Sequence, residues 1–198
     1  VARCQSVSDV QACLAFAQSQ GIPLVARSGG HSYAGFSLTP GLMIDVSPMN
    51  QVEFDPASGR ARVGGGGRNA NVYAALRPPS VAVTHGRCKE VGVGGLVLGG
   101  GIGFNMRLHG LTCDALVETE MVTADGRLLT CNAQNNRDLF WACRGAGGGN
   151  FGIHTSFTFQ TYPVGQLTVY LLKWSSNHRQ VLGALSQLLP NTPRELGC

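Results

Sequence analysis

The sequence predicts an α+β fold, and three observations lead to this prediction. Stretches that alternate strand, helix and strand are interrupted by two antiparallel hairpins, an order that fits neither an all-parallel nor an all-antiparallel sheet. Hydrophobic residues make up 43% of the 198 residues and charged residues only 13%, which is typical of a chain with a buried core. The 28 glycines gather between apolar segments, in clusters at residues 29–30, 64–67, 92–103 and 145–152.

The N-terminal part alternates short strands with a helix. Residues 1–4 are typical of the end of a strand. Ser6 and Asp9 form a capping-box pattern and Gly21 follows the last apolar position of the helical period, so residues 6–20 are predicted as a helix. The elements expected next are apolar strands at 23–26 and 42–46 around a loop at 27–35, a hairpin of strands 51–54 and 60–63, and a short helix at 71–76.

The C-terminal part contains a second hairpin and a boundary. Asp125 and Gly126 form a turn signal between two strands. Residues 92–103 mix glycine with aliphatic residues and show no usable periodicity. The remaining expectations are strands at 116–123 and 127–131, a helix at 138–144, a strand at 153–162, a boundary at 163–165, a strand at 167–174 and a helix at 181–189.

Composition and charge exclude several classes of function. The net charge of +4 comes without a run of Lys or Arg, so no nucleic-acid binding is predicted. No run of roughly eighteen apolar residues occurs, which predicts no membrane span. Seven cysteines without a CxxC pair indicate neither a disulfide framework nor a zinc site, and no metal is expected. With Val1 first and no signal peptide visible, we expect a soluble chain that begins inside a domain, secreted or cytoplasmic.

Two glycine clusters match the dinucleotide-binding string G-x-G-x-x-G/A, but neither has the required context. Residues 65–70 follow a hairpin strand that carries Arg60 and Arg62, not an apolar parallel strand. Residues 147–152 stand between a helix and a strand, in the reverse order, and no acidic residue follows at the ribose-binding distance. A domain that binds NAD therefore stays an alternative with little support. No P-loop motif occurs.

The cluster at residues 27–32 (RSGGHS) has a different character. Successive small residues expose their backbone N–H groups, an arrangement that can cradle a pyrophosphate without a helix N-terminus. Ser28 and Ser32 add hydroxyl donors.

These residues carry a resemblance to a known family. Residues 27–35 (RSGGHSYAG) resemble the FAD pyrophosphate loop of the berberine-bridge-enzyme-like flavoproteins, within the vanillyl-alcohol-oxidase/p-cresol-methylhydroxylase (PCMH) superfamily. Further resembling segments are 86–95 (GRCKEVGVGG), 99–103 (GGGIG), 110–114 (GLTCD), 138–145 (DLFWACRG) and 148–152 (GGNFG), in the family's order. The resemblance implies a PCMH-type FAD-binding domain of two α/β subdomains over residues 1–165. Residues 166–198 are then the start of a truncated substrate-binding domain, and part of the N-terminus and the C-terminal return are expected to be missing.

The resemblance also implies how the flavin is held. His31 is expected to bond to the 8α-methyl group of the isoalloxazine and Cys88 to its C6, and both side chains are nucleophiles able to form such bonds. The other cofactor-binding residues it implies are Arg27, Ser28, Gly29, Gly30, Ser32, Val91, Gly92, Gly94, Gly95, Asn150, Gly152 and Ile153.

Ordinary interpretations of the same residue types stay open beside this one. Without the motif, His31 would be interpreted as a surface hydrogen-bonding residue and Cys88 as an inert core residue. His85 and Cys88 could be two metal ligands, but no second pair with matching spacing occurs. His109 and His154 are expected to be ordinary polar residues. Cys4, Cys13, Cys113, Cys131 and Cys143 are expected to be packing residues.

The implied activity is oxidation of an alcohol, sugar or amine-type C–H by hydride transfer to FAD. Dioxygen is the expected acceptor, giving hydrogen peroxide, because family members with valine at the position of Val91 tend to admit dioxygen. The sequence departs from the family pattern at Leu96, where plant members often carry His, and at Arg87 and Lys89 beside the cysteine. No catalytic base is identified. The expected partners are a small-molecule substrate, dioxygen and the remainder of the chain's own polypeptide; a flavin-binding fragment without activity of its own is the main alternative.

Overall fold

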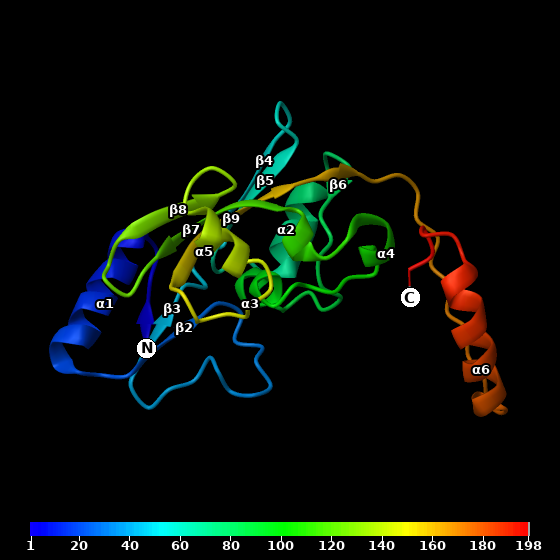
Figure 1. Ribbon diagram of the computed structural model, residues 1–198, viewed down its shortest axis with the longest axis horizontal. Helices are drawn as coiled ribbons and strands as arrows, with labels where there is room; N and C mark the ends of the chain where they lie inside the picture. The colour runs from blue at the N-terminus through cyan, green and yellow to red at the C-terminus, as the bar shows by residue number, and fades with distance from the viewer. Residues whose placement is uncertain (198) are drawn as a thin grey trace.

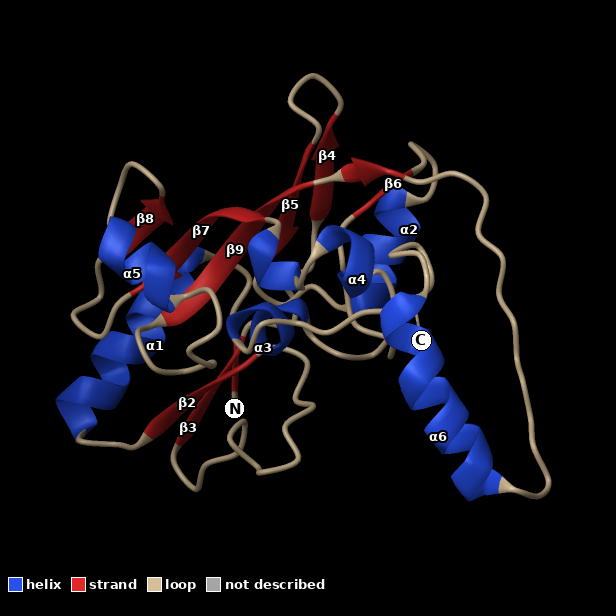
Figure 2. Ribbon diagram, turned by 45° about the vertical axis from the view of Figure 1, so that its right-hand side comes forward, coloured by secondary structure: helices blue, strands red, loops and turns tan. Residues whose placement is uncertain are grey.

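The computed structural model describes residues 1–197; Cys198, the last residue of the predicted second domain, lies outside the described residues. Three sheets organise these described residues, in the strand orders β1-β3-β2, β4-β5-β9-β7-β8 and β10-β6. The first sheet is parallel and the other two are antiparallel, so the predicted α+β class is confirmed. Figures 1 and 2 show the five-stranded sheet across the top of the molecule and the small parallel sheet with α1 at one end.

The N-terminal unit is a parallel sheet with one helix. Its elements are β1 (Ala2–Arg3), α1 (Val7–Gln20), β2 (Leu24–Arg27) and β3 (Leu42–Asp45). Ser6 caps α1 as predicted, since its hydroxyl accepts the Asp9 N–H at 3.2 Å and the Asp9 carboxylate accepts the Ser6 N–H at 3.0 Å. Gly21 ends the helix with φ 62°, a left-handed conformation that glycine adopts without strain.

The five-stranded sheet confirms both predicted hairpins. Its strands are β4 (Val52–Asp55), β5 (Arg60–Gly64), β7 (Leu116–Val122), β8 (Leu128–Asn132) and β9 (Ile153–Gln160). The central strand β9 pairs antiparallel with both β5 and β7, and its Phe157 and Phe159 are fully buried. The sheet therefore forms the structural centre of the larger unit.

Short helical segments pack against this sheet: α2 (Asn69–Leu76), α3 (Val93–Leu98), the 3₁₀ turn Thr112–Asp114 and α5 (Arg137–Ala142). The helix α4 (Met106–His109) buries none of its residues. The two-stranded ladder consists of β6 (Val81–Ala82) and β10 (Tyr162–Pro163). The unassigned glycine-rich stretch thus begins with a helix, α3, whose Val93, Val97 and Leu98 are buried.

The strand predicted at residues 167–174 is wrong. Those residues form no strand, and large side chains such as Val169 and Leu171 are exposed, because no described segment offers them a partner edge. They connect the body to α6 (His178–Leu188), which stands apart from the body in Figure 1. The 3₁₀ turn Leu189–Asn191 follows, and the Arg107 side chain of α4 donates to Thr192 and to the Leu196 carbonyl just beyond it. The predicted helix at 181–189 is confirmed with an earlier start.

Two hydrophobic clusters form the core of the part that the structure describes. The larger one lies between the five-stranded sheet and helices α2, α3 and α5, and the smaller one lies between the parallel sheet and α1. Val122 and Ile153, at the ends of β7 and β9, belong to the smaller cluster and join the two units. Four cysteines are buried in these clusters, as expected of packing residues: Cys4, Cys113, Cys131 and Cys143. Cys13 is half-buried against the smaller cluster.

Among residues 1–197, no helix is both long and apolar enough to cross a membrane.

Candidate functional site

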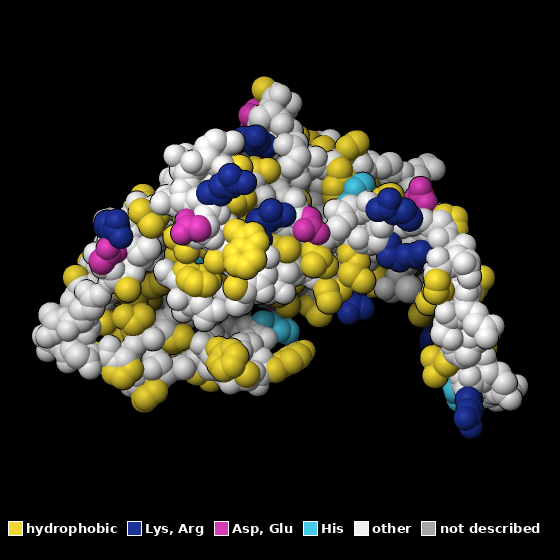
Figure 3. Space-filling model, viewed as in Figure 1, with side chains coloured by type: hydrophobic (Ala, Val, Ile, Leu, Met, Phe, Trp, Pro, Cys, Tyr) yellow, Lys and Arg dark blue, Asp and Glu magenta, His cyan; other side chains and the backbone are white. Residues whose placement is uncertain are grey.

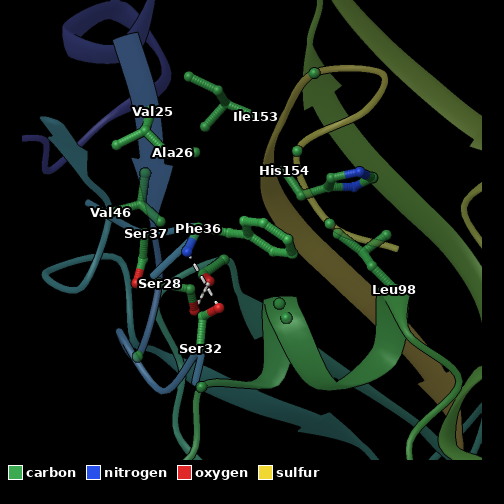
Figure 4. Close-up of a pocket in the computed structure, with 18 of the residues that line it drawn as sticks. Val25, Ala26, Ser28, Ser32, Phe36, Ser37, Val46, Leu98, Ile153 and His154 are labelled. Carbon is green, nitrogen blue, oxygen red and sulfur yellow. Dashed lines mark hydrogen bonds between the residues drawn. The ribbon is translucent and has the colours of Figure 1, made fainter. Parts of the chain in front are cut away.

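A cavity of about 600 Å³ lies where the two units meet. Val25, Ala26 and Val46 form one side with Ile153 beside them, Leu98 and His154 form the other, and Phe36 points into the space between them (Figure 4). The space-filling view shows the molecule hollowed between the body and the smaller lobe below it (Figure 3). The volume and the apolar walls are those of a site for an organic ligand.

The loop after β2 presents unpaired backbone donors to this cavity. Within the described chain, the amides of Gly29, Gly30, His31 and Ser32 have no protein acceptor. Side-chain bonds fix the loop at its two ends: the Ser28 hydroxyl donates to the Gly65 carbonyl at 2.8 Å, and the Ser32 hydroxyl accepts the Phe36 N–H at 3.2 Å. A row of free amides held in this way suits the negatively charged oxygens of a pyrophosphate.

Glycines bring pairs of backbone segments into direct contact at and near this loop. A β-carbon on Gly29 would lie against the Gly92 nitrogen and 2.7 Å from the Gly92 Cα, and a β-carbon on Gly92 would meet Gly29 in the same way. A β-carbon on Gly66 would lie 2.6 Å from the Ser47 Cα. These glycines therefore allow protein backbones to approach one another, and only part of the glycine signal belongs to a ligand.

Gly95 differs, because a β-carbon there would meet no atom of residues 1–197 within 4 Å, apart from its own helix backbone and chain neighbours, although the residue lines the cavity. We expect Gly95→Ala to lower the flavin content of the purified protein several-fold while the protein without flavin unfolds no earlier, since alanine favours a helix by about 1 kcal/mol over glycine. Absorbance per protein and thermal unfolding measure the two effects. Gly183→Ala, an equally open helical glycine outside the cavity, is the matched control; loss of flavin in both variants would contradict the prediction.

The loop before β9 forms another wall. The Gly147 N–H donates to the Leu98 carbonyl at 2.7 Å, which fastens the loop to the end of α3. The Asn150 side-chain amide donates to the Ala146 carbonyl at 2.9 Å and so closes its own loop. A β-carbon on Gly152 would lie 2.5 Å from the Val122 carbonyl oxygen, so glycine lets this loop pass close to β7.

Most of the sequence-predicted cofactor residues come together around this cavity. Its lining includes Ser28, Gly29, Gly30, His31, Ser32, Val91, Gly92, Gly94, Gly95, Asn150, Gly152 and Ile153. Arg27 and Cys88 are outside the lining. The Arg27 guanidinium lies against Gly30, 2.6 to 2.7 Å from where a β-carbon on that residue would be, and Gly30 has a φ of 69°. Cys88 is exposed on the loop of residues 86–91.

Sequence reasoning missed the apolar walls and one histidine. The missed lining residues are Leu14, Leu24, Val25, Ala26, Phe36, Ser37, Val46, Gly65, Leu96, Leu98, Val122, Ala124, Gly148, Gly149, Phe151 and His154. The available signal was the pair of short apolar strands that flank the loop of residues 27–35, because ligand pockets are lined mostly by apolar side chains.

His154 was expected to be an ordinary polar residue, but it is buried at the cavity wall. Its Nδ1 lies 2.8 Å from the Thr119 hydroxyl oxygen, and that hydroxyl donates its only proton to the Ser156 carbonyl. Nδ1 must therefore carry a proton and donate it to Thr119, which leaves Nε2 as an acceptor 3.9 Å from the Cys143 sulfur. Burial lowers the pKa of His154 to about 4, so the ring is neutral at physiological pH.

This histidine makes stability depend on pH. Because its folded-state pKa of about 4 is below its ordinary 6.5, the protein should lose about 3 kcal/mol of unfolding free energy as pH falls from 6.5 through 4. Denaturant unfolding at several pH values measures this change in unfolding free energy. His154→Asn should lack the change, because asparagine can donate to Thr119 but does not titrate. The exposed His178→Asn is the control; equal pH slopes in wild type and His154→Asn would refute the assignment.

The geometry excludes a Rossmann-type site at the two glycine strings. The strand before residues 65–70 is β5, which pairs antiparallel with both of its neighbours, and residues 147–152 connect α5 to β9. His85 packs edge-on against Tyr73, with ring centroids 4.2 Å apart, and burial lowers its pKa. No group of three potential metal-ligating side chains occurs in the part of the chain that the structure describes.

Comparisons with known proteins agree with the resemblance seen in the motifs. The FAD-binding-domain family matches residues 1–132. The chain is 39% identical over 200 residues to a xylooligosaccharide oxidase of Thermothelomyces thermophilus, covering 96% of this chain and 40% of that protein. It is 34% identical over 191 residues to an (R)-6-hydroxynicotine oxidase of Paenarthrobacter nicotinovorans, covering 96% and 42%.

The fold agrees with a solved structure as well. The protein BBE-like 1 of Physcomitrella patens matches with a TM-score of 0.79 at 39% identity, covering 81% of this chain and 36% of that one. The chain spans about 40% of the length of the curated relatives it matches.

Proposed function

Because the chain belongs to the FAD-binding-domain family of the berberine-bridge-enzyme-like oxidoreductases, we propose that it is the FAD-binding part of an FAD-dependent oxidase. Residues 1–165 would form the FAD-binding domain and residues 166–198 the beginning of a substrate-binding domain. The flavin would be bonded to both His31 and Cys88.

The observation that carries this proposal is the cavity with its row of free amides. The N–H groups of Gly29, Gly30, His31 and Ser32 would hold the pyrophosphate, and Arg27 would support their loop from below. Apolar walls and a volume of about 600 Å³ suit the aromatic and sugar parts of the same ligand. The residues present therefore fit FAD.

His31 and Cys88 have the chemistry and exposure that attachment requires. Both side chains are exposed, and His31 lies on the cavity lining while Cys88 stands on the loop that leads to Val91 and Gly92 of that lining. Bound FAD would supply the oxidant, taking a hydride from the substrate and passing two electrons to dioxygen to give hydrogen peroxide. The chain's own residues would hold and orient it.

The proposed substrate class is an alcohol, sugar or amine with a C–H bond beside oxygen or nitrogen. The named relatives include a xylooligosaccharide oxidase and a 6-hydroxynicotine oxidase, so a sugar and an amine both occur among similar proteins. The catalytic base is not assigned to any residue of this chain. The remainder of the polypeptide would supply the substrate side.

Acid precipitation of the full-length protein tests attachment, and peroxide release tests the reaction. Yellow colour should stay with the precipitate, on peptides that contain residues 31 and 88. Release of hydrogen peroxide should follow addition of an oligosaccharide or a cyclic amine. Flavin in the supernatant would overturn the covalent bonds but keep FAD, and a colourless protein would overturn the whole proposal.

Val91 tests the choice of dioxygen as acceptor. Its side chain lies at the cavity lining three residues after Cys88, and a leucine there would add a methylene group to the space beside the flavin. We expect Val91→Leu to slow reoxidation of reduced flavin by dioxygen about tenfold or more, a barrier increase of about 1.4 kcal/mol, with little change in flavin reduction. Stopped-flow absorbance separates the two half-reactions, and an unchanged reoxidation rate would remove Val91 from this role.

A further inference from the structure

We propose that helix α2 holds the loop of residues 86–91 in position for the bond between Cys88 and the flavin, with Asn69 and Tyr73 as positioning residues. The inference rests on the proposed function, because it concerns the second of the two proposed flavin bonds. It assigns a role to a helix that does not line the cavity.

The backbone of the loop is bound to the first turn of α2. The Asn69 N–H donates to the Val91 carbonyl at 3.0 Å, and the Ala70 N–H donates to the Lys89 carbonyl at 2.9 Å. Amides in the first turn of a helix have no partner within the helix, so the loop satisfies them and the helix in turn fixes the loop. The Val91 N–H closes a turn by donating to the Cys88 carbonyl at 3.3 Å.

Two side chains of α2 add contacts on either side of Arg87. The Asn69 side-chain amide donates to the Cys88 carbonyl at 2.9 Å, and the Tyr73 hydroxyl donates to the Gly86 carbonyl. Asn69 and Tyr73 are four residues apart and therefore lie on one face of the helix. Burial raises the pKa of Tyr73, and the negative charge of a Cys88 thiolate would raise it further, so the hydroxyl stays protonated and remains a donor.

Asn69 is fully buried and uses only part of its hydrogen-bonding capacity. Its side-chain amide nitrogen is bonded to the loop, but its side-chain oxygen has no partner within residues 1–197. An unpaired buried oxygen costs stability, and leucine would fill a similar volume without one. Stability alone therefore does not account for an asparagine here, whereas a donor to the Cys88 carbonyl does.

This arrangement fixes the backbone around Cys88 and leaves its thiol exposed. Attachment joins the Cys88 sulfur to flavin C6: the thiol and C6 each lose hydrogen, two electrons reach the flavin, and dioxygen removes them as hydrogen peroxide. Such a bond forms efficiently only when the sulfur is held near the carbon. A loop bonded to α2 at its backbone and through two side chains would supply that constraint.

The test compares Asn69→Leu, Tyr73→Phe and the double variant in the full-length protein. Peptide mass spectrometry gives the ratio of Cys88-linked to His31-linked flavin, and thermal unfolding gives the stability of each variant. Asn71→Ala is the matched control, because the Asn71 side-chain oxygen accepts the Arg68 N–H at the start of the same helix at 2.9 Å and forms no hydrogen bond with the loop within residues 1–197. A purely structural role would lower both linkages together.

We expect each single variant to reduce the Cys88-linked fraction about fivefold, the factor for one lost hydrogen bond, and the double variant more. The His31-linked fraction and the melting temperature should change little, and Asn71→Ala should keep the wild-type ratio. An unchanged ratio in the double variant would overturn the role of α2. If wild type itself lacks flavin on Cys88, the second bond of the proposed function fails and this inference fails with it.

Discussion

Replacing both His31 and Cys88 with alanine is expected to move all of the flavin into the supernatant on acid precipitation. If the proposed linkage holds, each single variant should keep its flavin in the precipitate through the other proposed bond, because a covalent bond survives unfolding of the chain. The measurement is flavin absorbance in the two fractions, with peptide mass to locate the label. We expect the bound fraction of the double variant to fall from nearly all to none.

Two control variants separate chemistry from folding. His178→Ala removes an exposed histidine of α6, and Cys13→Ala removes a half-buried thiol of α1; both should keep the wild-type distribution of flavin. Flavin that stays with the denatured double variant would mean that another nucleophile carries it. In that case the assignment of both residues would be wrong, while the FAD cavity would stand.

The second large effect is expected from Gly29→Ala. The added β-carbon would lie 2.7 Å from the Gly92 Cα, and backbone atoms of α3 and its preceding turn cannot yield as the end of a flexible side chain does. Overpacking of this kind should cost about 3 kcal/mol or more of unfolding free energy and displace the loop of residues 27–32. Thermal unfolding and flavin content should therefore fall together.

The control for Gly29→Ala is the same substitution at a glycine with open space around it. Gly165→Ala places the same group where no protein atom lies within 4 Å, and it should change neither quantity. Gly92→Ala should match Gly29→Ala, and the double variant should cost less than the sum because both β-carbons enter one contact. Normal flavin content in Gly29→Ala would show that the two segments separate easily, contrary to the packing described above.

Elements with local signals were predictable from sequence. Ser6, Asp9 and Gly21 specify both ends of α1, and the turns at residues 55–59 and 125–126 specify the two hairpins. The helix α3 was not predictable, because glycine between valines weakens its helical propensity and its burial by the large sheet decides its structure. The strand expected at residues 167–174 failed because a strand also needs a neighbour, and its apolar composition carries no information about one.

The polar part of the site was predictable and the apolar part was not. The successive small and hydroxyl side chains of residues 28–32 predict a ligand-binding loop, and the structure places this loop at the cavity. Val25, Val46 and Ile153 are ordinary apolar strand residues in the sequence, and only the meeting of the two sheets makes them a wall. His154 shows no sequence signal, because its role depends on burial and on Thr119 across the sheet.

The cavity separates two hydrophobic clusters, and the proposed flavin bonds start from opposite sides of that division. His31 follows β2 of the small parallel unit, whereas the loop of Cys88 is fixed to α2 over the larger cluster. A cofactor bonded to both would be a cross-link, closing the chain between residues 31 and 88 as a disulfide closes a loop. Closing such a loop would lower the conformational entropy of the unfolded chain and so raise the free energy of unfolding by about 4 kcal/mol. The cofactor would therefore stabilise the fold through this cross-link in addition to its non-covalent contacts.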